Sequence, residues 1–267
     1  MAKLCFKNKW IVVTGASGGL GLEIAKELAI NEKANLIIAA RRLDKLSELK
    51  KNIEGQCDSK VIIIETDLLN HESLYSLYEQ AISNVDVYGL INNAGITYYG
   101  KTDDKSISTF KNIVDVNFTA TMILSLKFLS YFKEKNCGSI LNITSGAALI
   151  PIPYQSVYSA SKHAIQAFTE ALIMENRNNN VNISIFAPGG IATEMLTNSG
   201  LSKKFPLDSH FNLDPQKAAR YAIKAIKKSK YTFIPGFLEN IYMFFRKLLP
   251  NKLVVGAAEK IYRPNEK

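Results

Sequence analysis

The chain has 267 residues, 47% of them hydrophobic, and a formal net charge of +9 at pH 7. A chain of this length can bury a sizeable core in one domain, and no linker, repeat or low-complexity stretch interrupts it. The three cysteines and three histidines are scattered without metal-ligand spacing, so we expect no metal site and a reducing compartment.

The first predicted elements are a strand, a glycine-rich turn and a helix. Trp10 to Thr14 form a short apolar run, and Gly15 to Gly21 follow it. From Leu20 onward apolar residues recur at helical spacing, which disfavours the alternative of a glycine-rich hairpin. A helix that begins at such a turn presents its positive end to a phosphate, so this segment predicts nucleotide binding. Residues 1–9 lead directly into the strand, and we therefore expect no cleaved signal.

Further strand-like runs alternate with helical segments along the chain. They cover residues 36–40, 61–65, 87–91, 139–144 and 181–187. This alternation predicts parallel βαβ units, that is, a single-domain α/β fold with a Rossmann-like, doubly wound parallel sheet and helices on both faces. Ligand sites in such sheets lie at the carboxyl ends of the strands. We expect this domain at residues 1–235 and a basic, aromatic C-terminal extension at residues 236–267.

Tyr158 and Lys162 lie four residues apart in a segment predicted to be helical, so both point from one helix face. A free tyrosine, with a pKa near ~10, is a poor proton shuttle at neutral pH, but a fixed ammonium nearby lowers that pKa. Together with the hydroxyl of Ser145, the pair has the groups needed to manage the proton of a carbonyl that becomes an alcohol. Exposed Tyr/Lys pairs at this spacing are also common, so the pair alone leaves a solvated surface pair as the alternative.

These segments together resemble the short-chain dehydrogenase/reductase family, and the match runs through most of the chain. Six motifs of that family occur in the family's order and spacing. They are the glycine motif at residues 14–21, the Asn-Asn-Ala-Gly element at residues 92–95, the asparagine at Asn117, the serine at Ser145, the Tyr-x-x-x-Lys pair at Tyr158 and Lys162, and the Pro-Gly segment at Pro188 and Gly189 with Thr193 after it.

The resemblance implies a role for each of these residues. Tyr158 would give its proton to the carbonyl oxygen that Ser145 orients, Lys162 would hold the nicotinamide ribose and lower the pKa of Tyr158, and Asn117 would hold a water beside Lys162. The residues expected to bind the dinucleotide are Gly15, Ser17, Gly18, Gly19, Leu20, Gly21, Arg41, Arg42, Asp67, Asn93, Ala94, Gly95, Tyr158, Lys162, Pro188, Gly189, Ile191 and Thr193. Asp67 would contact the adenine, although it is also a candidate helix cap before Leu68.

The end of the second predicted strand bears on the choice of dinucleotide. NAD-binding proteins commonly place a carboxylate about 20 positions after the glycine loop, whereas this chain has Arg41 and Arg42 in that region. A guanidinium suits a 2′-phosphate. Gly18 favours NAD(H) instead, because many NADP-preferring relatives carry a basic residue at that position. We expect NADP(H), with NAD(H) as the alternative.

Residues 190–214 are expected to form a mobile lid over the substrate. The segment is rich in apolar residues and includes Leu196, which we expect to contact the substrate together with Ser145 and Tyr158. An apolar pocket fits a lipophilic ketone or alcohol, such as a steroid or an acyl chain, better than a sugar. The alternative is that these side chains only pack the closed lid. Asp214 and Pro215 predict the N-cap and first residue of the next helix.

The C-terminal segment carries the whole net charge, with 12 basic and 3 acidic residues at positions 216–267. Apolar residues recur at helical spacing between Phe237 and Leu249, and Pro250 follows. This stretch is too short to span a bilayer, which needs about 20 apolar residues. It could pack on the domain or on a second subunit, or lie on an anionic membrane surface. Nucleic acid is not an expected partner, because the basic residues are mixed with an apolar face.

The chain is therefore expected to be an NADP(H)-dependent oxidoreductase that interconverts a carbonyl and a secondary alcohol. Its substrate would be a hydroxysteroid or ketosteroid, with a 3-oxoacyl or other lipid carbonyl as the alternative. We expect a cytoplasmic homodimer or homotetramer, with peripheral membrane contact as an open question. The other class is a non-catalytic, cofactor-sensing protein on the same scaffold. Such proteins typically lack the tyrosine or the lysine, and both are present here.

Overall fold

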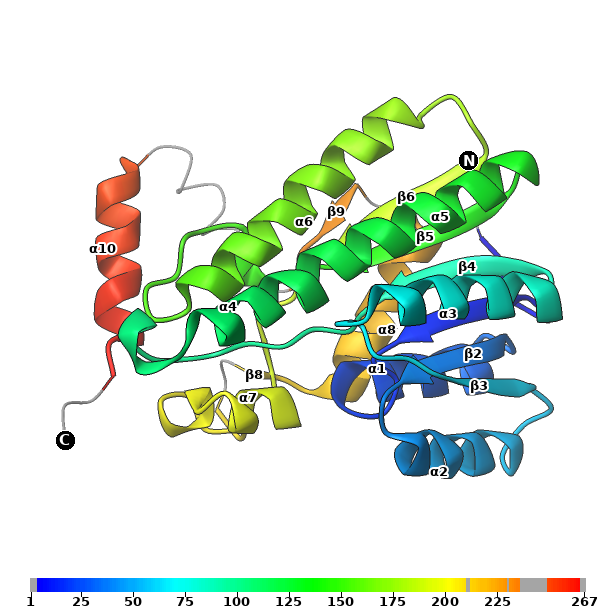
Figure 1. The fold of residues 1–267 in the computed structure, drawn as a ribbon, viewed down its shortest axis with the longest axis horizontal. Coiled ribbons are helices and arrows are strands. Elements are labelled where there is room, and N and C mark those ends of the chain that lie inside the picture. The colour runs from blue at the N-terminus through cyan, green and yellow to red at the C-terminus, as the bar shows by residue number, and fades with distance from the viewer. Residues whose placement is uncertain (1–3, 210–211, 230, 236–248, 265–267) are drawn as a thin grey trace.

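The computed structural model describes residues 4–209, 212–229, 231–235 and 249–264. Its centre is a seven-stranded sheet in the order β3-β2-β1-β4-β5-β6-β9, and every neighbouring pair is parallel (Figure 1). The strands are β1 (Trp10–Thr14), β2 (Asn35–Ala40), β3 (Val61–Glu65), β4 (Val87–Asn92), β5 (Gly138–Ile143), β6 (Val181–Phe186) and β9 (Thr232–Phe233). This confirms the predicted Rossmann-like α/β fold.

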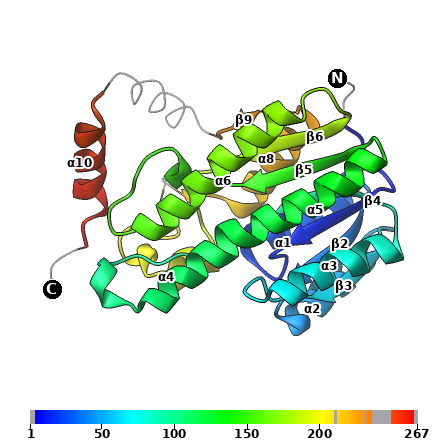
Figure 2. The same ribbon diagram turned by 45° about the horizontal axis from the view of Figure 1, so that its top comes forward.

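Helices cover both faces of the sheet (Figures 1 and 2). One layer contains α1 (Gly19–Lys26), α2 (Leu43–Glu54) and α8 (Pro215–Lys227), and the other contains α3 (His71–Asn84), α5 (Ala120–Glu134) and α6 (Ser156–Glu175). Strand residues alternate between the two layers, as the two-residue period of a strand requires. Ile11 and Val13 pack toward α1, whereas Val12, between them, packs toward α5.

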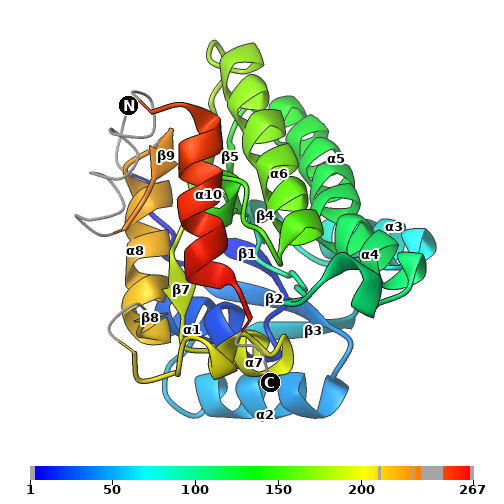
Figure 3. The same ribbon diagram turned by 90° about the vertical axis from the view of Figure 1, so that its left-hand side faces the viewer.

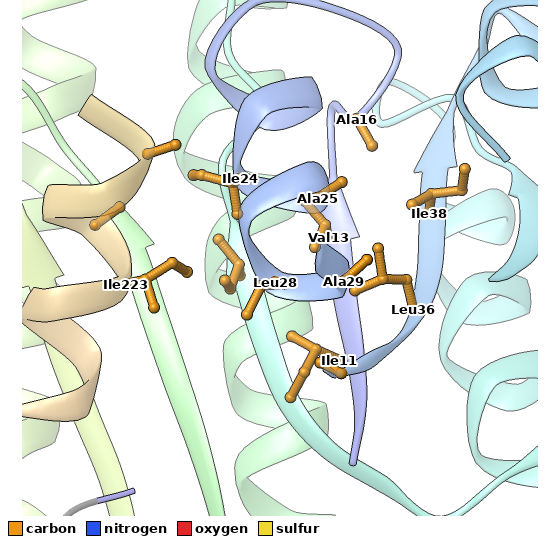
Figure 4. Close-up of a cluster of buried hydrophobic side chains, with 14 of the residues drawn as sticks. Ile11, Val13, Ala16, Ile24, Ala25, Leu28, Ala29, Leu36, Ile38 and Ile223 are labelled. Carbon is orange, nitrogen blue, oxygen red and sulfur yellow. The ribbon is translucent and has the colours of Figure 1, made fainter. Parts of the chain in front are cut away.

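The α1 layer shows why the first helix lies so close to the sheet. Ile24, Ala25 and Leu28 are fully buried and lie between the strand residue Val13 and Ile223 of α8 (Figure 4). The small alanine side chain lets the helix approach β1 without a gap. This packing fixes the N-terminus of α1 directly above the end of β1.

The order in which strands are added to the sheet reverses at β1. This strand pairs with β2 on one side and with β4 on the other, so the loops after β1 and β4 diverge to opposite faces. Crevices at such switch points, outside the carboxyl ends of parallel strands, are the usual ligand sites of this architecture. The glycine loop and the segment that begins at Asn93 both lie there.

The observed element boundaries support most of the predicted ones. The runs at residues 10–14 and 61–65 are strands over their full length, and Asp214 caps α8 by accepting a hydrogen bond from Lys217 N at 2.8 Å. The interpretation of Asp67 as a helix cap is wrong. The next helix, α3, begins at His71, and the side chain of Asn70 accepts hydrogen bonds from Glu72 N and Ser73 N. The short strand β9 was not expected.

Residues 107–134 form one continuous helical stretch, composed of α4 (Ile107–Val114), the π-turn η3 (Asp115–Thr119) and α5. Within the described part of the chain it is the one helix that is long and apolar enough to cross a membrane, but half of its most apolar window is buried inside the fold. Its buried residues Leu124 and Phe128 pack against the sheet. The stretch is thus a core helix of the α/β layer.

The predicted lid forms small elements of its own. β7 (Gly190–Ile191) pairs with β8 (Asn212–Leu213), and α7 (Glu194–Asn198) lies between them. A last helix, α10 (Asn251–Tyr262), crosses the side of the molecule where α7 and α4 lie (Figure 3). The apolar stripe predicted between Phe237 and Leu249 lies outside the described residues except for Leu249, which is exposed.

Candidate active site

Ser145, Tyr158 and Lys162 meet at the carboxyl end of β5. Ser145 follows this strand, and Tyr158 and Lys162 project from the first turns of α6. Lys162 is 4% exposed, its Nζ donates a hydrogen bond to Ile143 O at 3.0 Å, and it lies 5.9 Å from the centroid of the Tyr158 ring. The structure therefore brings together the three residues that the sequence singled out.

The pKa values of the pair move in opposite directions. Burial raises the pKa of Tyr158, and its hydrogen bond with Ser145 lowers that pKa to a lesser extent. Burial also lowers the pKa of Lys162 to about 8, because desolvation disfavours a charged ammonium. Burial and the Ser145 hydroxyl are the two causes of the shift at Tyr158, so a lowering of its pKa by Lys162 stays a prediction.

Asn117 lies in the π-turn η3 and ties two segments of the site together. Its Nδ2 donates to Ile96 O and to Ser161 Oγ, each at 3.0 Å, and its Oδ1 accepts from Ile96 N at 2.8 Å. The hydrogen bonds of this side chain thus go to the loop after β4 and to α6. A water held by Asn117 stays a prediction.

The glycine loop has the geometry of a phosphate site. Gly15 and Gly19 have φ angles of +68° and +55°, in the left-handed region that favours glycine. A Cβ on Gly21 would lie 2.3 Å from Gly15 O, so no other residue fits there. Gly18 is the N-cap of α1 and provides no side-chain hydrogen bond, so the first amides of this helix are available to an anionic ligand.

The Asn-Asn-Ala-Gly segment braces this loop. Asn93 Nδ2 donates to Thr14 O at 3.0 Å, and Asn93 N donates to Thr14 Oγ1 at 3.1 Å. The side chain of Asn93 is therefore committed to the loop after β1, so any contact with a ribose falls to other atoms of the segment. Ala94 packs against Gly15, and a Cβ on Gly95 would lie 3.6 Å from Lys162 Nζ.

Arg42 links the glycine loop to the lid. Its Nη2 donates to Ser17 O at 3.0 Å, its Nε donates to Ser17 Oγ at 3.3 Å, and its Nη1 pairs with Glu194 Oε2 at 3.2 Å. Arg41 is exposed beside it. No local sequence pattern indicates this contact of Glu194, because the pair joins residues that are far apart in the chain.

The remaining predicted site residues are placed as follows. Leu20 is 8% exposed and its side chain belongs to the core of the α1 layer, so only its backbone faces the loop. Asp67 Oδ1 accepts a hydrogen bond from Leu69 N at 3.1 Å. Pro188 O accepts from Gly146 N at 2.6 Å. The other members are Gly189 beside Gly146, Ile191 against the core, Thr193 beside Gly19, and the buried Leu196.

A small pocket with four aromatic residues in its lining opens next to Tyr158. It is lined by Tyr98, Gly100, Thr102, Phe110, Ile113, Tyr154, Gln155, Ser156, Val157 and Tyr158. No sequence pattern predicts Tyr98, Phe110 or Tyr154 at the site, because these aromatic residues converge from separate loops and helices. Among the described residues no group of three His, Cys, Asp or Glu side chains is placed to hold a metal ion.

Comparison with known proteins gives a consistent result. Residues 9–204 match the short chain dehydrogenase family. Dehydrogenase/reductase SDR family member 7B of Mus musculus is 30% identical over 261 residues, which cover 93% of this chain and 80% of the relative. The 17-beta-hydroxysteroid dehydrogenase type 3 of Mus musculus is 32% identical over 70% of this chain and 62% of the relative. Ketoacyl reductase HetN of Nostoc sp. is 34% identical over 82% of this chain and 76% of the relative.

Solved structures share the fold. A short chain dehydrogenase/reductase from Burkholderia phymatum in complex with NAD superposes with a TM-score of 0.84 at 21% identity, over 92% of this chain and 95% of that one. A short-chain dehydrogenase from Sphingobium yanoikuyae in complex with NADPH superposes with a TM-score of 0.80 at 20% identity, over 91% and 96%. One neighbour holds NAD and the other NADPH, so the fold alone does not select a dinucleotide.

Proposed function

Because this chain belongs to the short chain dehydrogenase family, and is thus an oxidoreductase of CH–OH donors that uses a nicotinamide dinucleotide, we propose that it prefers NADP(H) and a lipophilic ketone or alcohol of the hydroxysteroid type. The observation that carries the proposal is the convergence of Ser145, Tyr158 and Lys162 beside the glycine loop. The uncapped N-terminus of α1 and the tight approach of Gly21 to Gly15 fit a dinucleotide pyrophosphate.

The side chains divide the proton chemistry between them. When bound, the dinucleotide supplies or accepts the hydride. Burial keeps the pKa of Tyr158 above its usual value, so its phenol is protonated at neutral pH and can donate to a carbonyl oxygen. The Ser145 hydroxyl, which is hydrogen bonded to that phenol, orients the same oxygen. Lys162 holds its ammonium beneath the Tyr158 ring, where it stabilises negative charge on the phenol after the proton has left.

The preference for NADP(H) rests on Arg42. Its guanidinium lies against Ser17 of the glycine loop, and β2 ends in Ala39 and Ala40, followed by two arginines rather than by a carboxylate. A 2′-phosphate bound near this loop would find a planar donor within reach, and Arg41 would add positive charge. Directly after β2, where NAD-binding folds commonly provide an acidic partner for the ribose 2′-hydroxyl, this chain has arginine.

Two observations support a lipophilic substrate. Aromatic rings line the pocket beside Tyr158, and one relative is a 17-beta-hydroxysteroid dehydrogenase. The second candidate is a 3-oxoacyl substrate, which the similarity to a ketoacyl reductase favours. NADPH consumption with a panel of steroid ketones and 3-oxoacyl thioesters separates the two. Consumption with neither class would refute both substrate assignments.

We propose residues 1–235 as the catalytic domain, residues 236–267 as an extension, and a homodimer or homotetramer in the cytoplasm. Light scattering of the purified chain tests the oligomer, and a monomer at micromolar concentration would refute it. Flotation with anionic vesicles tests peripheral membrane contact through the basic extension.

The decisive experiment is Tyr158→Phe. Removing the phenolic oxygen takes away the proton donor and leaves the ring in place, so turnover should be lost while NADPH still binds measurably. Steady-state NADPH oxidation and a fluorescence titration with NADPH give the two readouts. Near-normal turnover in this variant would overturn the catalytic assignment.

A further inference from the structure

The C-terminal helix α10 contacts three segments of the chain, two of which line the pocket beside Tyr158. Tyr154, in the loop before α6, donates a hydrogen bond from its phenol to Glu259 Oε1 at 2.8 Å. Tyr99, in the loop after β4, donates to Tyr262 O at 2.8 Å. The ring of Phe205, from the lid, lies 5.2 Å from the ring of Tyr262. Figure 3 shows α10 lying across this side of the molecule, with its C-terminal end toward α7.

Glu259 is the acceptor on which this arrangement depends. Arg263 holds its carboxylate with two hydrogen bonds, Nε to Oε1 at 2.9 Å and Nη2 to Oε2 at 2.8 Å. The bonds from Arg263 and then from Tyr154 lower the pKa of Glu259 to about 2. The carboxylate is therefore ionised at neutral pH, and a charged acceptor forms stronger hydrogen bonds than a neutral one.

Tyr154 has a backbone conformation that needs external support. Its φ angle is +64°, a region that tyrosine rarely adopts. Residues in such conformations persist where the surrounding structure holds them in place. Two contacts of Tyr154 do so here. Its carbonyl oxygen accepts from Gly100 N at 2.9 Å, and its phenol is held by Glu259.

Tyr154 also forms part of the pocket wall. It lines the pocket together with Tyr98 and Phe110, whose rings pack edge to face with centroids 5.8 Å apart. Aromatic side chains offer large, rigid contact surfaces to an apolar ligand. A wall that is fixed before the ligand arrives loses less conformational entropy on binding.

We propose that α10 is a specificity element of the active site, in which Glu259 positions Tyr154 so that the aromatic wall is preformed for ketones with a rigid, apolar ring body. Glu259 is a positioning residue, since Tyr154 rather than Glu259 lines the pocket. The inference rests on the proposed function for its reaction, but ligand binding tests it independently of turnover. The inner face of α10, with Val254 and Ala258 buried, anchors the helix.

The test compares substitutions on one helix. In Glu259→Ala the acceptor for Tyr154 is lost, so the Kd of androst-4-ene-3,17-dione, measured by equilibrium dialysis, should rise about tenfold, the low end of the range that one apolar contact provides in a pocket. The kcat for cyclohexanone, which is too small to need the whole wall, should change less than about twofold. Glu259→Gln keeps an oxygen acceptor and should restore most of the affinity. Lys260→Ala, an exposed neighbour on α10, is the matched control and should behave as the wild type.

A double-mutant cycle separates positioning from general stability. Tyr154→Phe removes the phenol that Glu259 accepts, so combining it with Glu259→Ala should add little to either single change. Equal Kd values for wild type and Glu259→Ala, or fully additive effects in the cycle, would overturn the inference. A chain that binds the steroid ketone but never reduces it would refute the proposed function instead, and the Kd comparison would still decide the role of α10. Failure of the wild type to bind this ketone would overturn the inference directly.

Discussion

At the scale of single residues, the chemistry of the site follows from burial. Lys162 is almost fully buried, has one hydrogen bond to a main-chain carbonyl, and has a pKa lowered to about 8. The pKa of Tyr158 is raised instead, so its phenol keeps its proton. An enzyme that reduces a carbonyl needs a tyrosine that is protonated before the reaction and a cation that stabilises it afterwards. The raised pKa of Tyr158 and the lowered pKa of Lys162 together favour a tyrosine that is protonated before the reaction.

The shift on Lys162 predicts a change in stability with pH. The folded chain loses this proton near pH 8, whereas an unfolded lysine keeps it to about pH 10.4, so the unfolded state binds more protons and stability rises across this interval. Between pH 7 and 9.5 the free energy of unfolding of the wild type should rise by about 2 kcal/mol relative to Lys162→Met. Urea unfolding of both proteins at the two pH values measures this. Parallel pH profiles would contradict the lowered pKa.

The Arg42–Glu194 pair predicts an effect on dinucleotide choice. Both side chains are about half exposed or more, at 48% and 66%, so the pair adds little to stability. The carboxylate nevertheless opposes a 2′-phosphate beside Arg42. Glu194→Gln should tighten NADPH binding about threefold, or roughly 0.6 kcal/mol, and leave the Kd of NADH unchanged. Titrations with both dinucleotides measure the change, and Glu175→Gln is an exposed control. Equal changes for the two dinucleotides would contradict this role.

At the scale of secondary-structure elements, α1 and α3 begin in different ways for different reasons. The N-terminus of α1 has no side-chain cap, which leaves amide donors for a phosphate. The N-terminus of α3 is closed by Asn70, whose side chain accepts from two amides. The first helix end is therefore open to a ligand, whereas the second is closed by a side chain of the chain itself.

This difference predicts separable effects. Asn70→Ala removes the cap of α3 and should lower the free energy of unfolding by about 1 kcal/mol, while the Kd of NADPH stays the same. Asp67→Ala, three residues earlier, should instead weaken NADPH if Asp67 contacts the adenine as proposed. Urea unfolding and dinucleotide titration of both variants give the comparison. A loss of NADPH affinity in Asn70→Ala that matches its loss of stability would contradict the separation.

At the scale of the whole molecule, local patterns predicted the fold well and long-range contacts poorly. The apolar runs at β1 and β3 and the helical period after Leu20 specify βαβ units, because each signal lies within a few consecutive residues. The short strand β9 carries no such signal and pairs with β6 at the edge of the sheet. The contacts of Glu259 and Glu194 join distant parts of the chain. The direction of the Tyr158 pKa shift depends on burial, which the spacing to Lys162 does not encode.

The whole fold should respond to the dinucleotide in proportion to its affinity. A ligand at 100 times its Kd stabilises the native state by about 2.7 kcal/mol, which for a chain of this size raises Tm by about 5–10 °C. NADH at the same concentration, if it binds tenfold more weakly, should give about half that shift. Differential scanning fluorimetry with each dinucleotide measures both. In Arg42→Ala the shift with NADPH should fall to the level of NADH, because the guanidinium is the partner proposed for the 2′-phosphate. Equal shifts in the wild type, or a parallel loss of both in Arg42→Ala, would show that this chain does not select its dinucleotide through Arg42.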